Sequence, residues 1–334
     1  MDRPRLRDIA DHAQVSVSTV SRYLRGQIVL RPETEARIKT AVAELGLAPA
    51  VVGARAPIGV VFPALSTFPW ANIADEVTRV SFSRDASTLI ATALESPERH
   101  AQLLSSLADG LVSGIITTSY HLSAKLLRDI SNAGVPVVLV DTDAVTGLDS
   151  VVVDNHSGAF QAVSLLTAQG HRNIAMVAGY GDLTPTVERR HGWADALSLA
   201  GIDPDDQLTF FGDFTEEFGM AVLSHLRMAS TPPTAVFAGS DVIATGLMTA
   251  ARQQGMSLPD ELSIASFDGS PLCDKLTPPL TSIQVPHAAI AAAAVRLVMA
   301  RWAEPDRPAE TVVVPVALRH GASVAPCRAR SDVS

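Results

Sequence analysis

Cysteine is scarce in this 334-residue chain, which carries only Cys273 and Cys327 and has no C-x-x-C pair. Its nine histidines do not combine with these cysteines at the spacing of a metal site. This excludes a disulfide scaffold and a zinc site as the basis of the fold, and it is typical of a reducing compartment. We expect a cytoplasmic protein that holds no metal.

Long hydrophobic runs are also missing. No stretch approaches the ~18 consecutive apolar residues that cross a bilayer. The first residues, MDRPRLRDIA, lack the apolar centre of a signal peptide. We therefore expect a protein that is neither exported nor inserted into a membrane.

Signatures of several enzyme classes are absent as well. The sequence contains no G-x-x-x-x-G-K-[ST] phosphate loop and no G-x-S-x-G nucleophile elbow. The segment AGYGDLT places Gly179 and Gly181 after an expected strand, but it lacks the third glycine of a dinucleotide fingerprint. No motif arranges a Ser/His/Asp set. We expect no enzymatic activity and no cofactor.

Positive charge is scarce overall but not at the amino terminus. The net charge is −9, yet residues 1–56 hold nine Lys/Arg and six Asp/Glu, a net of +3. The remaining residues hold seventeen Lys/Arg and twenty-nine Asp/Glu, a net of −12. This asymmetry indicates a small module that meets a polyanion, carried by an acidic domain that stays away from phosphates.

The amino-terminal segment has the pattern of three short helices. A first apolar stripe at helical spacing consists of Leu6, Ile9, Ala10 and Ala13. After the turn 14–16, a second helix begins with Ser16 as its N-cap. Its inner face carries Val20 and Leu24, and its outer face carries Ser18, Ser21, Arg22 and Arg25. A third helix begins at Pro32, buries Ile38, Val42 and Leu45, and ends at Gly46.

From Ile58 onward, short apolar strands alternate with amphipathic helices. The expected strands are IGVVF, STLIATA, GIITTS, PVVLVD, SVVVD, NIAMVAG, LTFFG, TAVFAGS, LSIASFD and TVVVPVAL. SGAFQAVSLLTAQG and VIATGLMTAARQQG are typical of the helices between them. This alternation predicts parallel sheets covered on both faces. So many strands fit two doubly wound sheets better than one.

A helix, a short turn and a second helix with hydroxyl and basic residues on its outer face is a helix-turn-helix arrangement. Such a second helix presents its first side chains to base edges in the major groove. Arg22 can pair with guanine O6 and N7, and small hydroxyls can bind phosphates or bases. The alternative at this stage is a three-helix bundle that serves as a protein interaction domain.

The segments RLRDIADHAQVSVSTVSRYLRG and TEARIKTAVAELGLAP closely resemble the LacI/GalR family of bacterial transcription regulators, and the resemblance extends over nearly the whole chain. It implies a small all-α helix-turn-helix domain, a hinge, and an α/β core of two doubly wound, periplasmic-binding-protein-like lobes. It implies base readout by Val17, Ser18 and Arg22, and DNA backbone contacts from Ser16, Thr19, Ser21 and Arg25. The implied partners are an operator in double-stranded DNA, a small effector and a second copy of the chain.

The expected hinge departs from the family pattern Pro-Asn-x-x-Ala-Arg-x-Leu. PAVVGARA keeps Pro49 and Arg55 but has Ala56 where the family places a leucine that wedges into the minor groove. An alanine is too short to unstack a base step, and Gly53 lowers helix propensity by ~1 kcal/mol. We expect a weaker central kink in the bound DNA.

The resemblance also implies effector contacts in the core. ERRHGW matches the family's Arg-x-x-Gly-aromatic segment and makes Arg189 the expected ligand contact, because its guanidinium can bond hydroxyls or a carboxylate. Phe214 would stack on the ligand ring or belong to the core. Ser240 replaces a family asparagine, and Asp241 either faces the effector or caps the next helix. Asp268, at a strand end, either accepts ligand hydroxyls or makes a turn.

The first lobe offers three further effector candidates. PALSTFPW follows the first strand and supplies Ser66 and Trp70; Trp70 either covers the ligand or packs on its own lobe. His287 follows LTSIQVP at an expected crossover between lobes. Aromatic faces with an arginine and carboxylates indicate a polyhydroxylated effector, a sugar or a nucleoside.

The predicted protein is a dimeric repressor that binds a pseudo-palindromic operator under effector control. The alternatives are a small-molecule-binding protein without sequence-specific DNA binding and a sugar-modifying enzyme. The tail lacks apolar heptads, which favours a dimer over a tetramer. The expected domains are a helix-turn-helix domain at 1–48, a hinge at 49–57, lobe 1 at about 58–155 and 286–310, lobe 2 at about 156–285 and 311–325, and a tail at 326–334.

Overall fold

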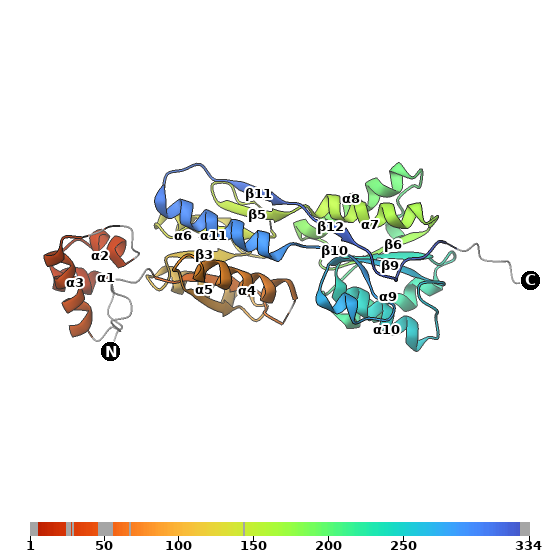
Figure 1. Cartoon of the computed structure of the whole chain (residues 1–334), viewed down its shortest axis with the longest axis horizontal. Helices are drawn as coiled ribbons and strands as arrows, with labels where there is room; N and C mark the ends of the chain where they lie inside the picture. Colours follow the sequence, from red (N-terminus) through yellow and green to blue (C-terminus); the bar gives the residue numbers. More distant parts are fainter. Residues whose placement is uncertain are drawn as a thin grey trace, which may run out of the picture. The chain divides into compact units, whose positions relative to one another are not determined.

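The computed structural model describes residues 6–24, 28, 30–45, 56–66, 68–142 and 144–327, without the side chains of Ser21 and Leu24. The chain divides into two compact units (Figure 1). Unit 1 comprises Met1–Val152 and His287–Val312, and unit 2 comprises Val153–Pro286 and Val313–Ser334. The chain therefore passes between the units three times.

The amino-terminal helices, drawn in red in Figure 1, are α1 (Leu6–Ala13), α2 (Val17–Leu24) and α3 (Pro32–Glu44). The Ser16 hydroxyl accepts a hydrogen bond from the Thr19 amide at 3.0 Å, so the expected N-cap is present. The apolar stripes of the three helices form one core: Ile9, Ala10, Ala13, Val20, Tyr23, Ile38, Ala41 and Val42. Gly46, the expected end of α3, lies outside the described residues.

Unit 1 contains a six-stranded sheet in the order β11-β5-β4-β3-β1-β2. Its strands are β1 (Ile58–Phe62), β2 (Thr88–Thr92), β3 (Gly114–Thr117), β4 (Val137–Val140), β5 (Asp149–Val153) and β11 (Thr311–Val314). The helices are α4 (Phe68–Phe82), α5 (Pro97–Ala108), α6 (Ala124–Asn132) and α11 (His287–Ala303). β1, β3 and β4 are buried along their whole length, which explains their continuous apolar sequence. α4 packs against α11, and α5 packs against α6.

Unit 2 contains a second six-stranded sheet in the order β12-β10-β9-β8-β6-β7. Its strands are β6 (Ile174–Ala178), β7 (Thr209–Phe211), β8 (Ala235–Ala238), β9 (Ser263–Asp268), β10 (Thr281–Gln284) and β12 (Ala317–Arg319). Its helices are α7 (Asn155–Ala168), α8 (Thr184–Leu199), α9 (Glu216–Met228) and α10 (Asp241–Gln253), with short turns η2 (Asp206–Leu208) and η3 (Pro271–Asp274). β12 is antiparallel to β10, and the other pairs are parallel.

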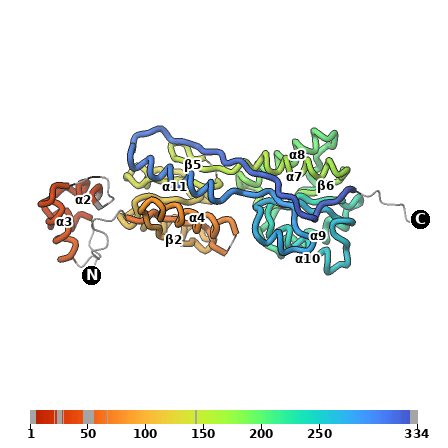
Figure 2. The backbone as a smooth tube through the Cα atoms, in the orientation of Figure 1, coloured from red at the N-terminus to blue at the C-terminus, as the bar shows by residue number. Residues whose placement is uncertain are grey.

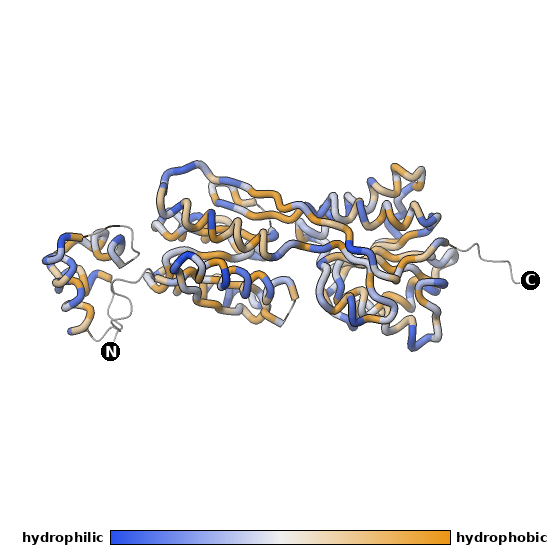
Figure 3. The backbone as a smooth tube through the Cα atoms, viewed as in Figure 1, coloured by the Kyte–Doolittle hydropathy of each residue, from blue (hydrophilic) through white to orange (hydrophobic). Residues whose placement is uncertain are grey.

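The helices of unit 2 pack in pairs on the sheet. α9 and α10 pack on each other and form a core with alternate residues of β6 and β8, such as Val177 and Val236. α7 and α8 form the other pair, and a Cβ at Gly192 of α8 would lie 2.2 Å from the His156 carbonyl of α7. Figure 3 shows the strands of both sheets largely in orange, as fully buried strands require.

Two features of the sheets differ from the sequence prediction. β10 was not expected as a strand, because TSIQ contains a single apolar residue, yet three of its four residues are buried. The expected strand TVVVPVAL is two strands: β11 ends before Pro315, which has no amide hydrogen for a ladder, and β12 belongs to the other sheet. Figure 2 follows this last segment of the chain in blue.

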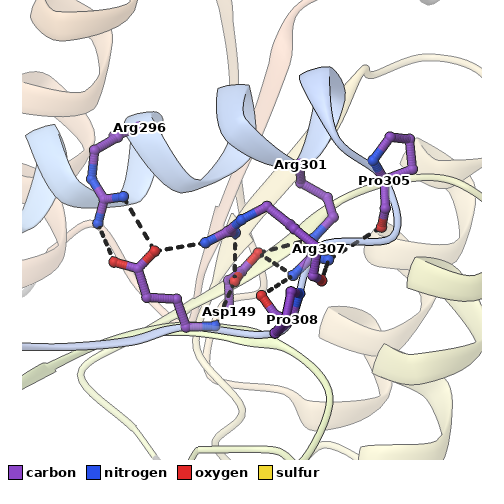
Figure 4. A network of polar contacts seen from close by, with 7 residues as sticks. Asp149, Arg296, Arg301, Pro305, Arg307 and Pro308 are labelled. Carbon is purple, nitrogen blue, oxygen red and sulfur yellow. Dashed lines mark hydrogen bonds and ion pairs between the residues drawn. The ribbon is translucent and has the colours of Figure 1, made fainter.

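A buried ionic network ties the end of α11 to the edge of the unit 1 sheet (Figure 4). The Asp149 carboxylate is 2% exposed and accepts hydrogen bonds from Arg301 Nε at 3.1 Å, Arg307 Nη1 at 2.9 Å and the Glu310 amide at 2.9 Å. The Glu310 carboxylate in turn bonds Arg296 and Arg307, both at 2.6 Å. Asp149 therefore holds two arginines and the start of β11 in one place.

Candidate nucleic-acid interface and effector site

The outer face of α2 carries the expected base-reading residues. Val17 is 43% exposed, and Ser18 and Arg22 are also exposed, while Val20 is fully buried. Arg22 Nε donates to the Ser18 carbonyl at 3.4 Å, which leaves Nη1 and Nη2 without a hydrogen bond among the described residues. This edge of the guanidinium is therefore available to a partner.

Three hydroxyl groups at the start of α2 bond one another. Ser16 Oγ lies 2.8 Å from Ser18 Oγ and 2.7 Å from Thr19 Oγ1. Ser16 also caps the helix, so the cluster orients the amino end of α2. The side chain of Ser21 and all of Arg25 lie outside the described residues, so their expected backbone contacts stay predictions, as do those of Ser16 and Thr19.

Contacts among the three helices fix the orientation of the exposed face, with α1 packed against both α2 and α3. Burial and the neighbouring Glu35 carboxylate raise the pKa of Tyr23 to about 12. Glu35 also pairs with Lys39 at 2.6 Å, and its pKa is lowered by Lys39 and Tyr23. On α1, His12 Nε2 lies 2.5 Å from Glu44 of α3. The three helices thus form one small body whose exposed side includes Val17 and Arg22.

Of the expected hinge residues, Pro49 and Arg55 lie outside the described residues. Ala56 is buried in unit 1, and its carbonyl accepts a hydrogen bond from Ser113 Oγ at 2.6 Å. The Ser113 carbonyl accepts from Trp302 Nε1 at 2.7 Å. Hydrogen bonding and burial therefore fix the chain in unit 1 at Ala56, near the end of the expected hinge. The weaker kink in the bound DNA stays a prediction.

The topology of unit 2 indicates where a ligand binds. β6 lies between β7 and β8, so the chain reverses its direction of sheet growth between β6 and β8. Ligands of open parallel sheets bind at the carboxyl ends of the strands beside such a switch point. Gly179 follows β6 and Gly239 follows β8, and each begins a segment that carries expected effector residues.

Arg189 of α8 reaches this edge of the sheet. It is 6% exposed, its Nε donates to Asn155 Oδ1 at 2.8 Å, and its Nη1 donates to the Gly239 carbonyl at 2.5 Å. Its guanidinium carbon lies 3.8 Å from the centroid of the Phe267 ring, a cation–π contact. These contacts fix the guanidinium plane and leave Nη2 as the donor without a partner in the described residues.

Phe214 lies at the same edge of the sheet. A Cβ on Gly179 would lie 2.0 Å from the Phe214 ring, so the ring rests directly on the Gly179 backbone. The Tyr180 ring meets Phe214 edge-on, with centroids 5.8 Å apart. Tyr180 is 44% exposed and Phe214 is half-buried, so the two rings form an aromatic corner next to β6.

Substitution of Gly179 with alanine is expected to displace the Phe214 ring and to weaken effector binding about fivefold, because a ring contact contributes ~1 kcal/mol. Binding to operator without effector should be unchanged. Isothermal titration with the effector measures the first effect. The control is Gly201→Ala: Gly201 is also in unit 2 and has nothing within 4 Å of its Cβ position, but its φ of +69° makes alanine strained there, so the effect of lost stability without displacement of Phe214 appears in this variant. Equal losses for both variants would contradict a role for the Phe214 ring.

Ser240 and Asp241 have structural partners. Ser240 is the N-cap of α10, accepting from the Ile243 amide at 3.3 Å. The Asp241 carboxylate is 1% exposed and accepts four hydrogen bonds: from Ser266 Oγ, Ser282 Oγ, the Ser270 amide and Cys273 Sγ, at 2.6 to 3.1 Å. Burial and Asp241 raise the pKa of Cys273 to about 12. Ser240, not Asp241, is therefore the cap, and the geometry favours a structural role for Asp241.

Asp268 ends β9 in an unusual conformation. Its φ is +115°, which L-residues rarely adopt. Its Oδ2 accepts from the Asp241 amide at 3.3 Å, and it is 8% exposed. The surrounding structure holds the Asp268 backbone in this strained conformation. Asp268 directly follows Phe267, whose ring contacts the Arg189 guanidinium. Arg189, Phe214 and Asp268 thus all occupy the carboxyl edge of the unit 2 sheet.

In unit 1, Trp70 packs on its own lobe. It is 8% exposed, stacks on Phe62 with centroids 4.9 Å apart and meets Tyr120 edge-on at 5.8 Å. Ser66 is exposed after β1. The first residue of α11, His287, meets Phe68 edge-on at 5.3 Å, and its Nε2 is buried without a hydrogen-bond partner among the described residues. A ligand could supply that partner.

A buried histidine, His100, and a half-buried one, His287, make the stability of unit 1 depend on pH. Burial lowers the pKa of both His100 and His287 to about 4. Because these folded-state values lie below the ordinary value of 6.5, the unfolded chain binds protons first as the pH falls. The contribution of each neutral histidine to the free energy of unfolding is fully present above pH ~6.5 and is lost as the pH falls to ~4. For His100 the loss between pH 7 and pH 5 is about 2 kcal/mol. Urea unfolding of His100→Gln should show a flatter pH dependence than the parent, and exposed His121→Gln should not.

Sequence reasoning missed two residues of the unit 2 site. Asn155, at the start of α7, orients Arg189, and Phe267 lies under its guanidinium. Both are separated from Arg189 by more than thirty residues in sequence, so no local motif links them. Strand ends were the available signal, because Asn155 follows β5 and Phe267 lies near the end of β9.

Among the residues that the structure describes, no group of His, Cys, Asp and Glu is arranged to hold a metal ion. In the same residues, no helix is both long and apolar enough to cross a membrane.

Comparison with known proteins gives two family matches. Residues 5–50 match the family described as bacterial regulatory proteins, lacI family, and residues 163–324 match a periplasmic binding protein-like domain. These matches confirm the predicted fold class, a helix-turn-helix domain joined to a two-lobed α/β core.

Curated relatives align over most of the chain. The HTH-type transcriptional regulator CelR of Thermobifida fusca is 31% identical over 301 residues, which cover 85% of this chain and 87% of CelR. DegA of Bacillus subtilis, also named an HTH-type transcriptional regulator, is 30% identical over 289 residues, covering 84% and 86%. Catabolite control protein A of Priestia megaterium is 28% identical over 298 residues, covering 87% and 90%.

Solved structures have the same fold. A complex of the transcriptional regulator CelR with cellobiose has a TM-score of 0.75 and 29% identity, covering 96% of this chain and 100% of that chain. The lac repressor dimer bound to operator and the anti-inducer ONPF has a TM-score of 0.74 over 97% and 100%, at 23% identity.

Proposed function

We propose that this chain, which belongs to the lacI family of bacterial regulatory proteins, is a repressor. It would bind a pseudo-palindromic operator as a homodimer under the control of a small effector. The relatives are transcription regulators, and the chain has their DNA-binding helices. The exposed face of α2, with the unused edge of the Arg22 guanidinium, is the observation that carries the proposal. Such a protein acts in the cytoplasm, where operator DNA lies.

The proposed DNA contacts divide by chemistry. Val17, Ser18 and Arg22 read bases, since they are exposed on α2, and the remaining hydroxyls and Arg25 contact phosphates. The acidic core is repelled by DNA, so that only the amino-terminal module docks. In a two-fold dimer, two copies of α2 would read two half-sites.

The proposed effector is a polyhydroxylated molecule of the sugar or nucleoside class. Arg189 supports this, since its plane is fixed and its Nη2 is available to hydroxyl or carboxylate oxygens. The Phe214 ring offers an apolar face of the kind that packs on a sugar or a base. Because the relative CelR is known in complex with cellobiose, cellobiose is the first effector to test. Effector binding would change operator affinity by about 5- to 150-fold.

Two experiments test this function. Selection of a randomised duplex pool at ~150 mM salt, which suppresses unspecific phosphate binding, should enrich a palindrome. Operator binding is then followed by fluorescence anisotropy with cellobiose and a panel of sugars and nucleosides. An active ligand should lose its effect in Arg189→Ala and keep it in Arg190→Ala, because Arg190 pairs with Asp206 at the surface. A pool that yields no motif would refute the regulator function.

A further inference from the structure

The amino end of α2 exposes one apolar side chain among polar groups. Val17, the first residue of the helix, is 43% exposed, whereas Val20 is fully buried in the three-helix core. A β-branched residue does not favour a helix, because it loses χ1 freedom there. Helix formation and core packing therefore do not account for a valine at this exposed position, which leaves its side chain open to contact with a partner.

The polar groups next to Val17 are engaged with one another. Ser18 Oγ bonds Ser16 Oγ at 2.8 Å, and Ser16 Oγ bonds Thr19 Oγ1 at 2.7 Å. Arg22 Nε bonds the Ser18 carbonyl, one turn back along the helix. These bonds hold the hydroxyl groups around Val17 in fixed positions, so its two methyl groups form a defined apolar spot in a polar face.

We propose that Val17 reads the C5 methyl group of a thymine in each operator half-site. This inference rests on the proposed function and specifies the chemical group that is read. In the major groove, the edges of the four base pairs present donors and acceptors, and the thymine methyl is the apolar group among them. A valine side chain can form no hydrogen bond, so its favourable contact there is with that methyl group.

The spacing of Val17 and Arg22 places this thymine relative to the guanine that Arg22 would read. Five residues of α-helix span ~7.5 Å along the axis. Successive bases on one DNA strand are ~3.4 Å apart. The thymine should therefore lie about two base pairs from the guanine, at mirrored positions in the two half-sites of a symmetric operator.

The test replaces the thymine by deoxyuridine, which pairs identically but lacks the methyl group. Affinity of the full-length protein for the selected operator should fall about fourfold for one half-site and about fifteenfold for both, from the burial energy of one methyl group per contact. Val17→Ala should bind the thymine operator more weakly and should bind the thymine and deoxyuridine operators equally well. Thermal unfolding checks that this exposed substitution leaves the fold intact.

Thr40→Ser is the matched control. It removes one methyl group from an exposed side chain of α3, away from the proposed base-reading residues, and it should retain the full dependence on the thymine methyl. An enriched half-site in which no thymine shows methyl dependence, or dependence that survives Val17→Ala, overturns this inference and leaves the proposed function standing. Failure to enrich any half-site would overturn both.

Discussion

Arg22→Ala is expected to remove selective operator binding, lowering the affinity of the dimer for its operator by about 2 to 6 kcal/mol. A bidentate arginine–guanine pair contributes about 1 to 3 kcal/mol of discrimination, and a symmetric operator contains two of them. The geometry supports a bidentate contact, since Nε is bonded within α2 and the terminal nitrogens have no hydrogen-bond partner among the described residues. Anisotropy titrations against the selected operator and a random duplex measure the change.

Charge removal alone must be separated from the loss of base readout. Arg190→Ala is the control, because it removes an exposed arginine from unit 2, far in sequence from α2. Affinity for random duplex should change little in either variant. If Arg22→Ala weakened operator and random duplex equally and reduced the salt dependence, Arg22 would be a phosphate contact. Effector affinity should be the same in all three proteins.

The amino-terminal helices could be predicted from sequence because their signals are local. The stripe from Leu6 to Ala13, the cap at Ser16 and the proline at the start of α3 each depend on neighbours within a turn or two. The ten expected strands were predicted in the same way, from short apolar runs in the sequence. One of these runs is divided at Pro315 between two sheets, and this division depends on the path of the chain in the folded protein.

The site in unit 2 was predictable only in part, because its geometry depends on distant residues. Arg189 and Phe214 were expected, but what fixes them is Asn155, Phe267 and the bare backbone of Gly179. Sequence left Asp241 open between two roles. Its four donors lie on β9, on β10, in the η3 turn and at the residue that precedes this turn, so its hydrogen-bonding role could not be deduced before the fold was known.

The Asp149 network gave no signal in the sequence, although we expect it to carry a large share of the stability of unit 1. Its partners Arg301 and Arg307 lie about 150 residues later in the chain. Both side chains are 13 to 14% exposed, and the Asp149 carboxylate is 2% exposed. With Asp149 removed, Arg307 would keep the Glu310 carboxylate, whereas Arg301 would keep backbone carbonyl oxygens but lose its carboxylate partner.

Asp149→Asn should therefore lower the free energy of unfolding of unit 1 by about 3 to 5 kcal/mol, the usual effect of removing one partner of a buried ion pair. The amide keeps the shape of the side chain, so the effect reports charge and hydrogen bonding instead of a cavity. Trp70 and Trp302 are the tryptophans of unit 1, so urea unfolding followed by fluorescence in a Trp193→Phe background reports this unit.

Asp129→Asn provides the comparison, because Asp129 pairs with Lys125 on the exposed face of α6 at 2.5 Å. Exposed pairs of this spacing contribute about 0.3 to 0.5 kcal/mol. At ~1 M salt the screening length is ~3 Å, which should abolish the small effect at Asp129 and leave most of the effect at Asp149, where solvent and ions do not reach. Equal effects for the two variants at either salt concentration would show that the Asp149 network is solvated and that unit 1 does not depend on it.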